Sequence, residues 1–586
     1  LMDRAIPIVL DAIADPEFGS GAVKITPAHD LNDFEAGKRH SLPMIKVIDE
    51  HAKMTAAAGT FAGLDRFEAR KRVVAELESL GLLEKIEPYK VNLRKCQRCH
   101  TIIEPLVSMQ WWMKMKPLAE PAIAAVKETP KKIEFVPENW EKTYLNWLEN
   151  IRDWCISRQL WWGHRIPAWF CGECEHITVG REDPAACEKC GSTKLRQETD
   201  VLDTWFSSGL WPFSTLGWPD DMEDLRAFYP TSLLVTGFDI IFFWAARMIM
   251  FGIELTGEVP FRQVHIHGLV RDAERQKISK MKGNVIDPLV VNDKFGTDAV
   301  RFGLMIAAAP GADPALSDEV IERGRNFANK IWNASRLLFS KSSSGDAAPT
   351  TLADRWIVSR LNWCAEEMNR AFSVHRYHEA ADAIWTFFWD EFCDWYLELK
   401  KGDEDWACAC VVYEKALRLL HPLMPFVTEE LWQRLGTPGR SIALALYPQW
   451  DSTAKDVAAE NTMEVIKRVV TEIRHSGTHA KINARVSAPL TAFAAIERNL
   501  AIIERLSHAT IALAAGEFAV AVDIPVDRDK VQRETEQLEK VIANSKRQLA
   551  NDAFTSKAPA HVIDSMRAKL ADYEAQLKKN RDALGS

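Results

Sequence analysis

Residues 231–270 read TSLLVTGFDIIFFWAARMIMFGIELTGEVPFRQVHIHGLV, and this segment carries the clearest signal of the fold class. A β-like run at Leu233–Val235 leads through a turn at Gly237–Asp239 into a long apolar run at Ile240–Thr256, and Val264–Val270 is again strand-like. Strand, turn, helix and strand in this order predict a doubly wound sheet of parallel strands. We expect the ligand site at the carboxyl ends of these strands, where such sheets bind their ligands.

The same stretch is apolar enough to suggest a membrane span. However, Asp239, Arg247 and Glu254 interrupt it, and ionisable side chains are costly inside a bilayer. A buried strand followed by a buried helix fits better, so no membrane association is predicted.

A loop rich in lysine follows the second predicted strand. Residues 277–284 read KISKMKGN, which places three ammonium groups beside a flexible Gly-Asn pair. A solvated lysine cluster is the common interpretation of such a run. Its position directly after a strand of the parallel type favours a loop that faces phosphate groups instead.

Six of the eleven cysteines form three Cys-x-x-Cys pairs. Cys171, Cys174, Cys187 and Cys190 offer four thiolates in two knuckles, which is the ligand set of a tetrahedral structural zinc site. The third pair, Cys96 and Cys99, is half of a possible second zinc site, or a pair of reduced cysteines without metal. The other five cysteines are scattered singly, which predicts a reducing cytoplasm and not a secreted disulfide framework.

Length and charge limit the classes of protein further. A chain of 586 residues with 47% hydrophobic content is too long for one core, so several domains are expected. The net charge of −9 argues against nucleic-acid binding over the whole surface, although local basic faces remain possible. The chain begins with Leu1 and with a strand-like Ile6–Leu10, so we expect that the natural N-terminus lies further upstream.

Patterns along the chain divide it into segments. Residues 1–90 combine a β-like run at Ala22–Ile25 with a helical stretch at Arg66–Leu80, which predicts a small α/β module. Residues 311–350 are expected to form a helical junction, residues 351–450 a helical domain, and residues 451–525 a small connecting segment.

Residues 526–586 carry a heptad-like pattern. Apolar side chains recur in steps of three and four from Ile563 to Leu584 with one polar position at Asn580, and an earlier stretch from Val531 to Leu549 has compatible spacing. With Phe554–Pro559 as the turn, this pattern predicts an antiparallel coiled coil of two helices.

Several motifs together resemble one family. Lys277–Met281 resembles the KMSKS loop of class I aminoacyl-tRNA synthetases. The motifs at Trp154–Pro167, Leu202–Pro212, Thr236–Asp239 and His267–Leu269 resemble, in this order, those of the valyl members. The resemblance implies a valine-tRNA ligase whose partners are tRNA(Val), valine, ATP and Mg²⁺, acting as a monomer. It also implies that residues 91–310 are the second half of a Rossmann-type catalytic domain, with a zinc-knuckle insertion at 171–190.

The family assigns roles to residues at the predicted strand ends. Gly237 and Asp239 would bind the ribose of ATP, and His267 with Gly268 would border the adenine. The catalytic loop residues Lys277, Ser279 and Lys280 would contact the phosphates, Lys280 neutralising the charge that builds there. Trp205 would flank the valine side chain.

The opening module resembles the C-terminal part of the family's editing domain, through Ala22–Asp30 and Asn32–Glu35. Editing is needed because a hydrophobic valine pocket cannot strongly reject threonine, an isostere that merely adds a hydroxyl. By resemblance, Asp33 would hold the α-amino group of the misattached amino acid. Lys24, Thr26 and Asp30 would position substrate and water, and Asp30 is also expected to cap a helix.

Two further domain assignments follow from the same resemblance. Residues 351–450 resemble the helical anticodon-binding domain, and residues 526–586 resemble a coiled-coil arm that contacts tRNA through basic side chains. The chain has no His-x-Gly-His motif, so we expect that this piece alone does not make valyl-adenylate. The alternatives are a piece of an isoleucyl enzyme, against which the absence of cysteine after Cys410 argues, and a non-catalytic tRNA-binding protein built from synthetase domains.

Overall fold

The computed structural model describes residues 4–88, 90, 92–96, 99–278, 283–341, 347–436, 439–475, 482–523, 528–551 and 560–584. The chain forms two compact units, each described here by itself. Unit 1 comprises residues 1–124, 147–220 and 250–257, and unit 2 comprises residues 125–146, 221–249 and 258–586. Three helices have residues in both units, namely α3 (Lys116–Lys127), α4 (Asn139–Glu149) and α7 (Ala246–Thr256).

The first part of unit 1 is built on two helices, α1 (Leu31–Arg39) and α2 (Arg66–Ser79), with a short 3₁₀ segment at Ala56–Phe61 between them. Aspartates cap both helices, because Asp30 accepts from the backbone of Asn32 and Asp65 accepts from the backbone of Phe67. The helix predicted at Arg66–Leu80 is confirmed as α2. The predicted strand at Ala22–Ile25 is wrong, because this segment lies extended without pairing to any described strand.

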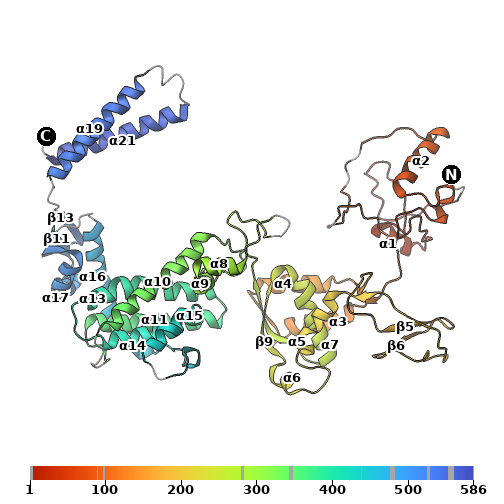
Figure 1. Ribbon diagram of the computed structural model, residues 1–586, viewed down its shortest axis with the longest axis horizontal. Coiled ribbons are helices and arrows are strands. Elements are labelled where there is room, and N and C mark those ends of the chain that lie inside the picture. Colours follow the sequence, from red (N-terminus) through yellow and green to blue (C-terminus); the bar gives the residue numbers. More distant parts are fainter. Residues whose placement is uncertain are drawn as a thin grey trace. The chain divides into compact units, whose positions relative to one another are not determined.

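The rest of unit 1 consists of short antiparallel strands, helix α5 and parts of α3, α4 and α7 (Figure 1). One sheet has the order β6-β5-β7, and two ribbons pair β1 with β3 and β4 with β8. The bounds are β1 (Trp112–Met113), β3 (Trp154–Cys155), β4 (Ser157–Arg158), β5 (Ala168–Cys171), β6 (Ile177–Val179), β7 (Leu195–Gln197), β8 (Val201–Leu202) and α5 (Thr204–Ser214).

Unit 2 contains the predicted parallel sheet, in the order β2-β10-β9. The strands are β2 (Glu134–Val136), β9 (Thr231–Gly237) and β10 (Phe261–His267), and both pairings are parallel. The chain leaves β9 through a 3₁₀ turn and a π-helical turn (Ile241–Ala245) before α7, so the expected helix at Ile240–Thr256 is distorted at its start. The second strand begins at Phe261 and ends at His267, three residues earlier at each end than the sequence suggested.

Helices fill the middle of unit 2, as predicted. Their bounds are α6 (Glu223–Phe228), α8 (Pro288–Phe295), α9 (Thr297–Ala307), α10 (Asp318–Phe339), α11 (Leu352–Ser373), α12 (Tyr377–Trp385), a π-helical segment at Thr386–Tyr396, α13 (Leu397–Lys400), α14 (Ala407–Leu420), α15 (Pro425–Arg434) and α16 (Val457–His475). Fully buried aromatic side chains such as Phe327, Phe388, Tyr396 and Trp406 belong to one continuous core, which gives these helices a common apolar interior.

A small α/β element follows the helices. Its sheet has the order β12-β11-β13, in which β11 (Ile482–Ala488) runs parallel to β12 (Ala509–Ala515) and antiparallel to β13 (Ala519–Asp523). Helices α17 (Leu490–Arg498) and α18 (Leu500–Ser507) connect β11 to β12. The segment that we expected to be a connector therefore has a sheet of its own.

The C-terminal residues form a pair of long helices, α19 (Arg528–Leu549) and α21 (Ala560–Leu584), drawn in blue in Figure 1. Two ion pairs join them: Glu539 contacts Arg581 at 2.7 Å, and Lys546, further along α19, contacts Glu574, earlier in α21, at 2.6 Å. The two helices are therefore antiparallel. The expected turn at Phe554–Pro559 lies outside the described residues.

The buried positions of this helix pair follow the predicted spacing. In α21 the partly buried residues are Ile563, Met566, Leu570, Tyr573, Leu577 and Asn580, and in α19 the partly or fully buried residues are Val531, Thr535, Leu538, Ile542, Ser545 and Leu549. Steps of three and four keep these residues on one face of each helix. Among all described helices, none combines the length and apolar character that crossing a bilayer requires.

Candidate functional site

The carboxyl ends of β9 and β10 lie next to each other, as the sequence predicted. Gly237, the last residue of β9, pairs in register with His267, the last residue of β10. Asp239 follows in the 3₁₀ turn, exposed, and a β-carbon on Gly237 would lie 2.8 Å from its Oδ1 atom. His267 is also exposed, and its Nδ1 atom lies 2.7 Å from the carbonyl oxygen of Gly268. The structure thus brings all four predicted strand-end residues together.

Gly268 is fixed by close contact with a distant segment. A β-carbon at this position would lie 2.0 Å from the carbonyl oxygen of Ala312, so no other residue fits without moving the backbone. The neighbouring Asp313 accepts a hydrogen bond from the backbone of Leu269 at 2.8 Å and another from Arg271 Nε. The hydrogen bond from Leu269, together with Arg271, lowers the pKa of Asp313 and keeps the carboxylate charged.

The lysine loop is tied together at its base. The carboxylate of Asp272 accepts from the backbone N–H of Gln276 at 2.6 Å and from the amide of Asn284 at 2.8 Å. The same amide donates to the carbonyl oxygen of Lys277 at 3.3 Å. Lys277 is exposed, which suits a phosphate contact. The predicted residues Ser279 and Lys280 lie outside the described residues.

A cavity of about 400 Å³ lies beside this edge of the sheet. One wall is a pair of stacked rings, Trp140 and Phe238, with centroids 5.5 Å apart and planes inclined by 7°. The other lining residues are Arg271, Arg275 and Gly311–Asp313. No local pattern in the sequence places residues 311–313 here, since the hydrogen bond joins Asp313 to Leu269, 44 residues earlier.

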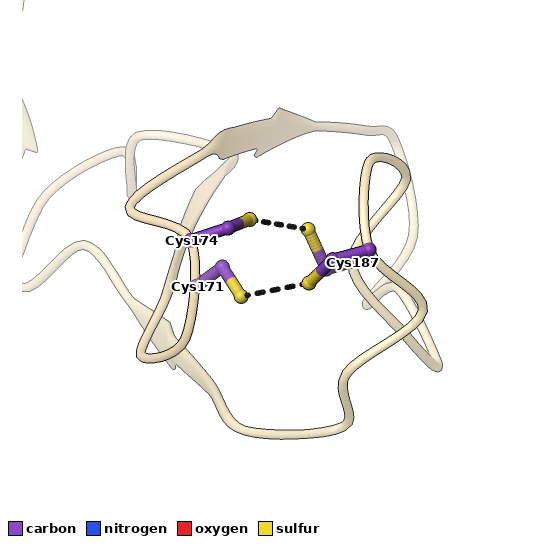
Figure 2. A group of neighbouring side chains, drawn as sticks. Cys171, Cys174 and Cys187 are labelled. Carbon is purple, nitrogen blue, oxygen red and sulfur yellow. Dashed lines mark hydrogen bonds between the residues drawn. The ribbon is translucent and has the colours of Figure 1, made fainter.

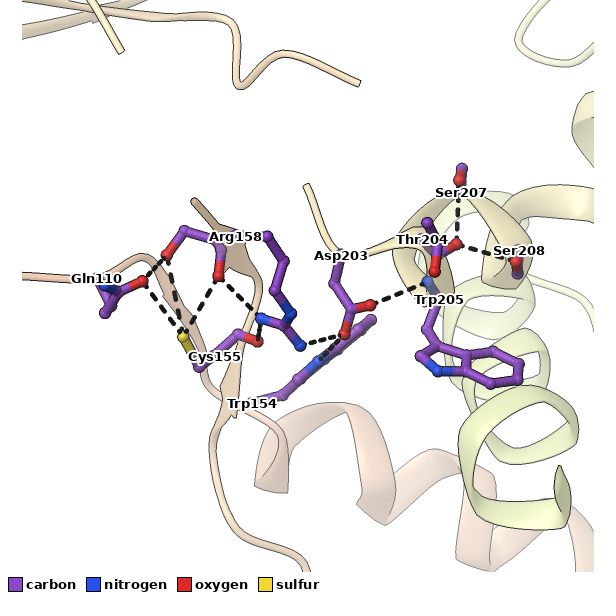
Figure 3. A network of polar contacts seen from close by, with 10 residues as sticks. Gln110, Trp154, Cys155, Arg158, Asp203, Thr204, Trp205, Ser207 and Ser208 are labelled. Carbon is purple, nitrogen blue, oxygen red and sulfur yellow. Dashed lines mark hydrogen bonds and ion pairs between the residues drawn. The ribbon is translucent and has the colours of Figure 1, made fainter. Parts of the chain in front are cut away.

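Trp205 stands at the start of α5, where a buried aspartate organises the surroundings (Figure 3). Asp203 caps the helix by accepting from the backbone N–H of Trp205 at 3.3 Å. The other oxygen of this carboxylate accepts from Arg158 at 2.6 Å and from the indole N–H of Trp154 at 3.1 Å. The sequence analysis missed Asp203, Arg158 and Trp154, although they stand within the two motifs that it quoted.

The four predicted zinc ligands converge (Figure 2). The sulfur atoms of Cys171, Cys174, Cys187 and Cys190 all lie within 4.8 Å of one another. Backbone N–H groups of Cys174 and Glu173 point at the sulfur of Cys171 and lower its thiol pKa to about 6, which favours the thiolate that binds metal. Four thiolates at this spacing fit a tetrahedral Zn²⁺.

The other cysteine pair has a different environment. Cys99 donates from sulfur to the hydroxyl of Thr101 at 3.3 Å, and hydrogen bonds with Thr101 lower the pKa of the Cys99 thiol to about 7. Among the described residues, no third histidine, cysteine or carboxylate completes a metal site with Cys96 and Cys99. In the described part of the chain, Cys96 and Cys99 therefore supply only two of the ligands that a zinc site needs.

The four predicted editing residues meet around the start of α1. The carboxylate of Asp33, almost fully buried, accepts from the backbone N–H of Thr26 at 2.7 Å and from its hydroxyl at 3.0 Å. Lys24 donates to the same hydroxyl at 3.2 Å. Asp30 caps the helix by accepting from the backbone of Asn32 and Asp33, as expected. Three polar side chains, Lys24, Thr26 and Asp33, therefore form one connected chain.

Three family models match the chain. Residues 28–317 match "tRNA synthetases class I (I, L, M and V)", residues 354–492 match "Anticodon-binding domain of tRNA ligase", and residues 523–586 match "Valyl tRNA synthetase tRNA binding arm". The strand-end site, the zinc knuckles and the motifs around Trp205 all fall within the first match.

Curated relatives match over nearly the whole chain. A valine–tRNA ligase of Solibacter usitatus is 58% identical over 99% of this chain and 71% of its own length. Those of Syntrophotalea carbinolica and Geobacter sulfurreducens are 47% and 48% identical, over 100% and 98% of this chain and 70% and 69% of their own lengths.

Proposed function

Because the chain belongs to the valine–tRNA ligase family of class I tRNA synthetases, we propose that the strand edge at Gly237, Asp239 and His267 binds ATP and then valyl-adenylate. The reaction of the family is the ATP-dependent attachment of valine to its tRNA. The observation that supports this site most strongly is the parallel register that sets Gly237 beside His267, with Asp239 on the next turn. Neither the isoleucyl enzyme nor a non-catalytic protein is favoured, given the valyl tRNA-binding arm and the identity to valine–tRNA ligases.

The strand-end residues suit a nucleotide. The exposed carboxylate of Asp239 accepts hydrogen bonds from the two ribose hydroxyls. Gly237 and Gly268 lack side chains, so the nucleotide can approach the backbone closely. His267, exposed at the end of β10, borders the adenine.

The lysine loop supplies positive charge to the phosphates. An oxygen of the valine carboxylate attacks the α-phosphorus, the bond to the bridging oxygen breaks, and pyrophosphate leaves. Lys277 and Lys280 neutralise the charge that develops on the phosphates, and the hydroxyl of Ser279 donates a hydrogen bond there. Mg²⁺, which arrives with ATP, would supply the remaining charge compensation at the phosphates.

The second step uses tRNA(Val). Its terminal ribose hydroxyl attacks the carbonyl carbon of valyl-adenylate, and AMP leaves with the bonding electrons. Trp205 flanks the valine side chain during both steps. Asp203 fixes the first turn of α5, because its carboxylate binds the helix backbone, Arg158 and Trp154 at once, so Trp205 is held on a rigid support.

The connected chain of Lys24, Thr26 and Asp33 serves editing. The carboxylate of Asp33 binds the α-amino group of misattached threonine, and the hydroxyl of Thr26, which donates to this carboxylate, keeps it oriented. Lys24 and Asp30 position the ester and the attacking water. Hydrolysis then releases threonine from tRNA(Val).

Other parts of the chain bind tRNA and stabilise the fold. The helices of residues 354–434 take the anticodon end, and α19 with α21 forms a coiled-coil arm whose exposed basic residues contact phosphates. These residues are Lys540, Lys546, Arg547, Lys578 and Lys579. Zn²⁺ at the four cysteines would hold the β5–β7 ribbon, and none of the eleven cysteines forms a disulfide, which suits the reducing cytoplasm in which we propose that the chain acts as a monomer.

Binding of this chain to transcripts of tRNA(Val) and tRNA(Ile) at one fixed salt concentration tests the proposal. Salt must be fixed because electrostatic affinity for nucleic acids depends strongly on it. We expect clear preference for tRNA(Val). Equal binding of both transcripts, or preference for tRNA(Ile), would contradict the assigned substrate.

A further inference from the structure

Two consecutive tryptophans stand almost fully exposed in unit 1. Trp161 is 93% exposed and Trp162 is 81% exposed, and Leu160 beside them is 56% exposed. Tryptophan is the side chain with the largest apolar surface to bury, so two adjacent ones in water indicate a surface that another molecule covers.

The loop that carries these tryptophans is anchored at both ends. On one side, Arg158 of β4 pairs with Val201 of β8. On the other side, the backbone N–H of Leu202 donates to the carbonyl oxygen of His164 at 2.7 Å. Gly163 packs directly on the sheet, where a β-carbon would lie 2.9 Å from the Val201 side chain. The tip is therefore held in place by β8 on both sides.

The base of the loop belongs to the network that supports the candidate valine pocket. Arg158, the last residue before the loop, donates to Asp203 at 2.6 Å, and Asp203 caps α5, the helix that carries Trp205 (Figure 3). The loop tip is four residues from Arg158, a span of roughly 14 Å at most. The molecule that meets the tip is thus within reach of Trp205, the residue proposed to flank the valine side chain.

The charge of the loop selects among possible partners. From Ser157 to Ile166 the chain has no acidic residue, and the positively charged Arg165, three residues after Trp162, is exposed. Flat aromatic faces flanked by cationic groups are the combination with which proteins hold unpaired nucleotides, since the bases stack on the rings and the phosphates meet the cations. An apolar protein segment would leave the guanidinium of Arg165 without an anionic partner.

We propose that Trp161 and Trp162 form a stacking platform for the unpaired nucleotides at the 3′ end of tRNA(Val). The inference rests on the proposed function, which requires the terminal ribose to reach valyl-adenylate near Trp205. The platform holds the bases that precede this ribose, and His164 with Arg165 meets their phosphates. Its contribution is to binding and positioning of the tRNA end.

The test compares two transcripts of tRNA(Val), one intact and one lacking its last three nucleotides, in binding to the full chain at fixed salt. Stacking of one or two bases predicts that the parent chain binds the intact transcript at least about tenfold more tightly. The double variant Trp161→Ala/Trp162→Ala is expected to lose this difference while binding the truncated transcript as before. Trp161→Phe/Trp162→Phe, which keeps flat rings, is expected to retain most of it.

Trp332→Ala provides the matched control, because Trp332 is another exposed tryptophan, at 38%, outside unit 1 and outside the residues that match the anticodon-binding domain and the tRNA-binding arm. It should leave both affinities unchanged, and circular dichroism melting curves should agree for all variants. The platform is excluded if the double alanine variant keeps the preference for the intact end, if it weakens both transcripts equally, or if the parent has no such preference. A parent that prefers tRNA(Ile) to tRNA(Val) would instead count against the proposed function.

Discussion

Gly268 and Ala312 approach so closely that a β-carbon on the glycine would lie 2.0 Å from the carbonyl oxygen of the alanine. The contact joins the end of β10 to the segment that supplies Asp313, so the backbone on which the nucleotide would rest is held from both sides. Gly257, a glycine in a turn with open space around its would-be β-carbon, has no comparable neighbour.

Gly268→Ala should therefore separate the strand end from residues 311–313. Overpacking of this kind costs about 1–3 kcal/mol, and we expect a loss of stability in this range together with weakened ATP binding. Urea denaturation and calorimetric titration with ATP measure the two effects. Gly311→Ala is the control, because Gly311 has a positive φ but free space around its would-be β-carbon, so this change should lower stability without a steric clash. Equal ATP affinity in the parent chain and in Gly268→Ala would refute the assignment of this strand edge to nucleotide binding.

Asp33→Ala should impair editing. The carboxylate accepts two hydrogen bonds from Thr26, and its loss removes the partner proposed for the substrate amino group. Hydrolysis of separately prepared threonyl-tRNA(Val) should slow by about tenfold or more, as expected when a charged hydrogen bond is lost. Asp65→Ala is the control, since Asp65 is another aspartate of this module that accepts a backbone hydrogen bond but lies outside the editing cluster. Unchanged hydrolysis after Asp33→Ala would remove this residue from the editing site.

The four-cysteine site should contain one Zn²⁺ per chain. Metal analysis of the purified chain measures it, and Cys174→Ser should lower both the zinc content and the protection of β5–β7 from proteolysis, because two knuckles without a metal cannot hold this ribbon. Cys155→Ser, a change outside the cluster, should leave both unchanged. If the purified chain contains no metal and does not bind added Zn²⁺, the four cysteines do not form a zinc site.

Stability should fall as the pH drops through the range in which histidine titrates. Burial lowers the pKa of His265 below its ordinary value, and burial also lowers the pKa of His375, whose ring lies 5.7 Å away. The unfolded chain then binds more protons than the folded one just below pH about 6.5, so the free energy of unfolding decreases there. Urea unfolding at pH about 7.5 and about 5.5 should show a smaller difference for His265→Gln than for the parent; the same difference in both would exclude His265 as the cause.

Asn580→Leu should stabilise the C-terminal helix pair. The amide nitrogen of Asn580 is buried without a hydrogen-bond partner among the described residues, at a position where the other seam residues of α21 are apolar. Removing this group and adding apolar contact should be worth about 1–2 kcal/mol. Hydrogen exchange of α19 and α21 in the full chain measures the change, with the exposed Lys579→Leu as control. Faster exchange in Asn580→Leu would mean that the amide makes a bond essential to the pair.

The parts that the sequence predicted share a local signal. The spacing of Ile563 to Leu577 predicted the buried face of α21, and the Cys-x-x-Cys pairs predicted the metal cluster, because in both cases the geometry follows from spacing alone. By contrast, the strand at β12 was missed, since its alanines are poor strand formers and their placement depends on pairing with β11. The strand predicted at Ala22–Ile25 was wrong for the opposite reason: its residues favour an extended backbone, but no described strand lies beside them to form a sheet.

In the candidate site, too, some residues could be predicted from local sequence patterns and others could not. Gly237, Asp239, His267 and Gly268 were predictable from the ends of two apolar runs and from the motifs around them. Asp313, which binds Leu269 and Arg271 from more than 40 residues away, carries no mark of this role in the sequence, and the motif around Asp203 does not reveal that its carboxylate binds Arg158. Hydrogen-bond partners of this kind come together only when distant segments pack in the folded chain.

The register of the parallel sheet also sets the order in which the chain can fold during synthesis. β10 pairs with β2 through Gln263 and Glu134, which lie 129 residues apart. Contacts between such distant residues form slowly, because the loop between them must close first. The ribosome must therefore release β10 before β2 gains its partner, so β2 stays unpaired, and open to wrong association, while the zinc ribbon between the two strands is being made.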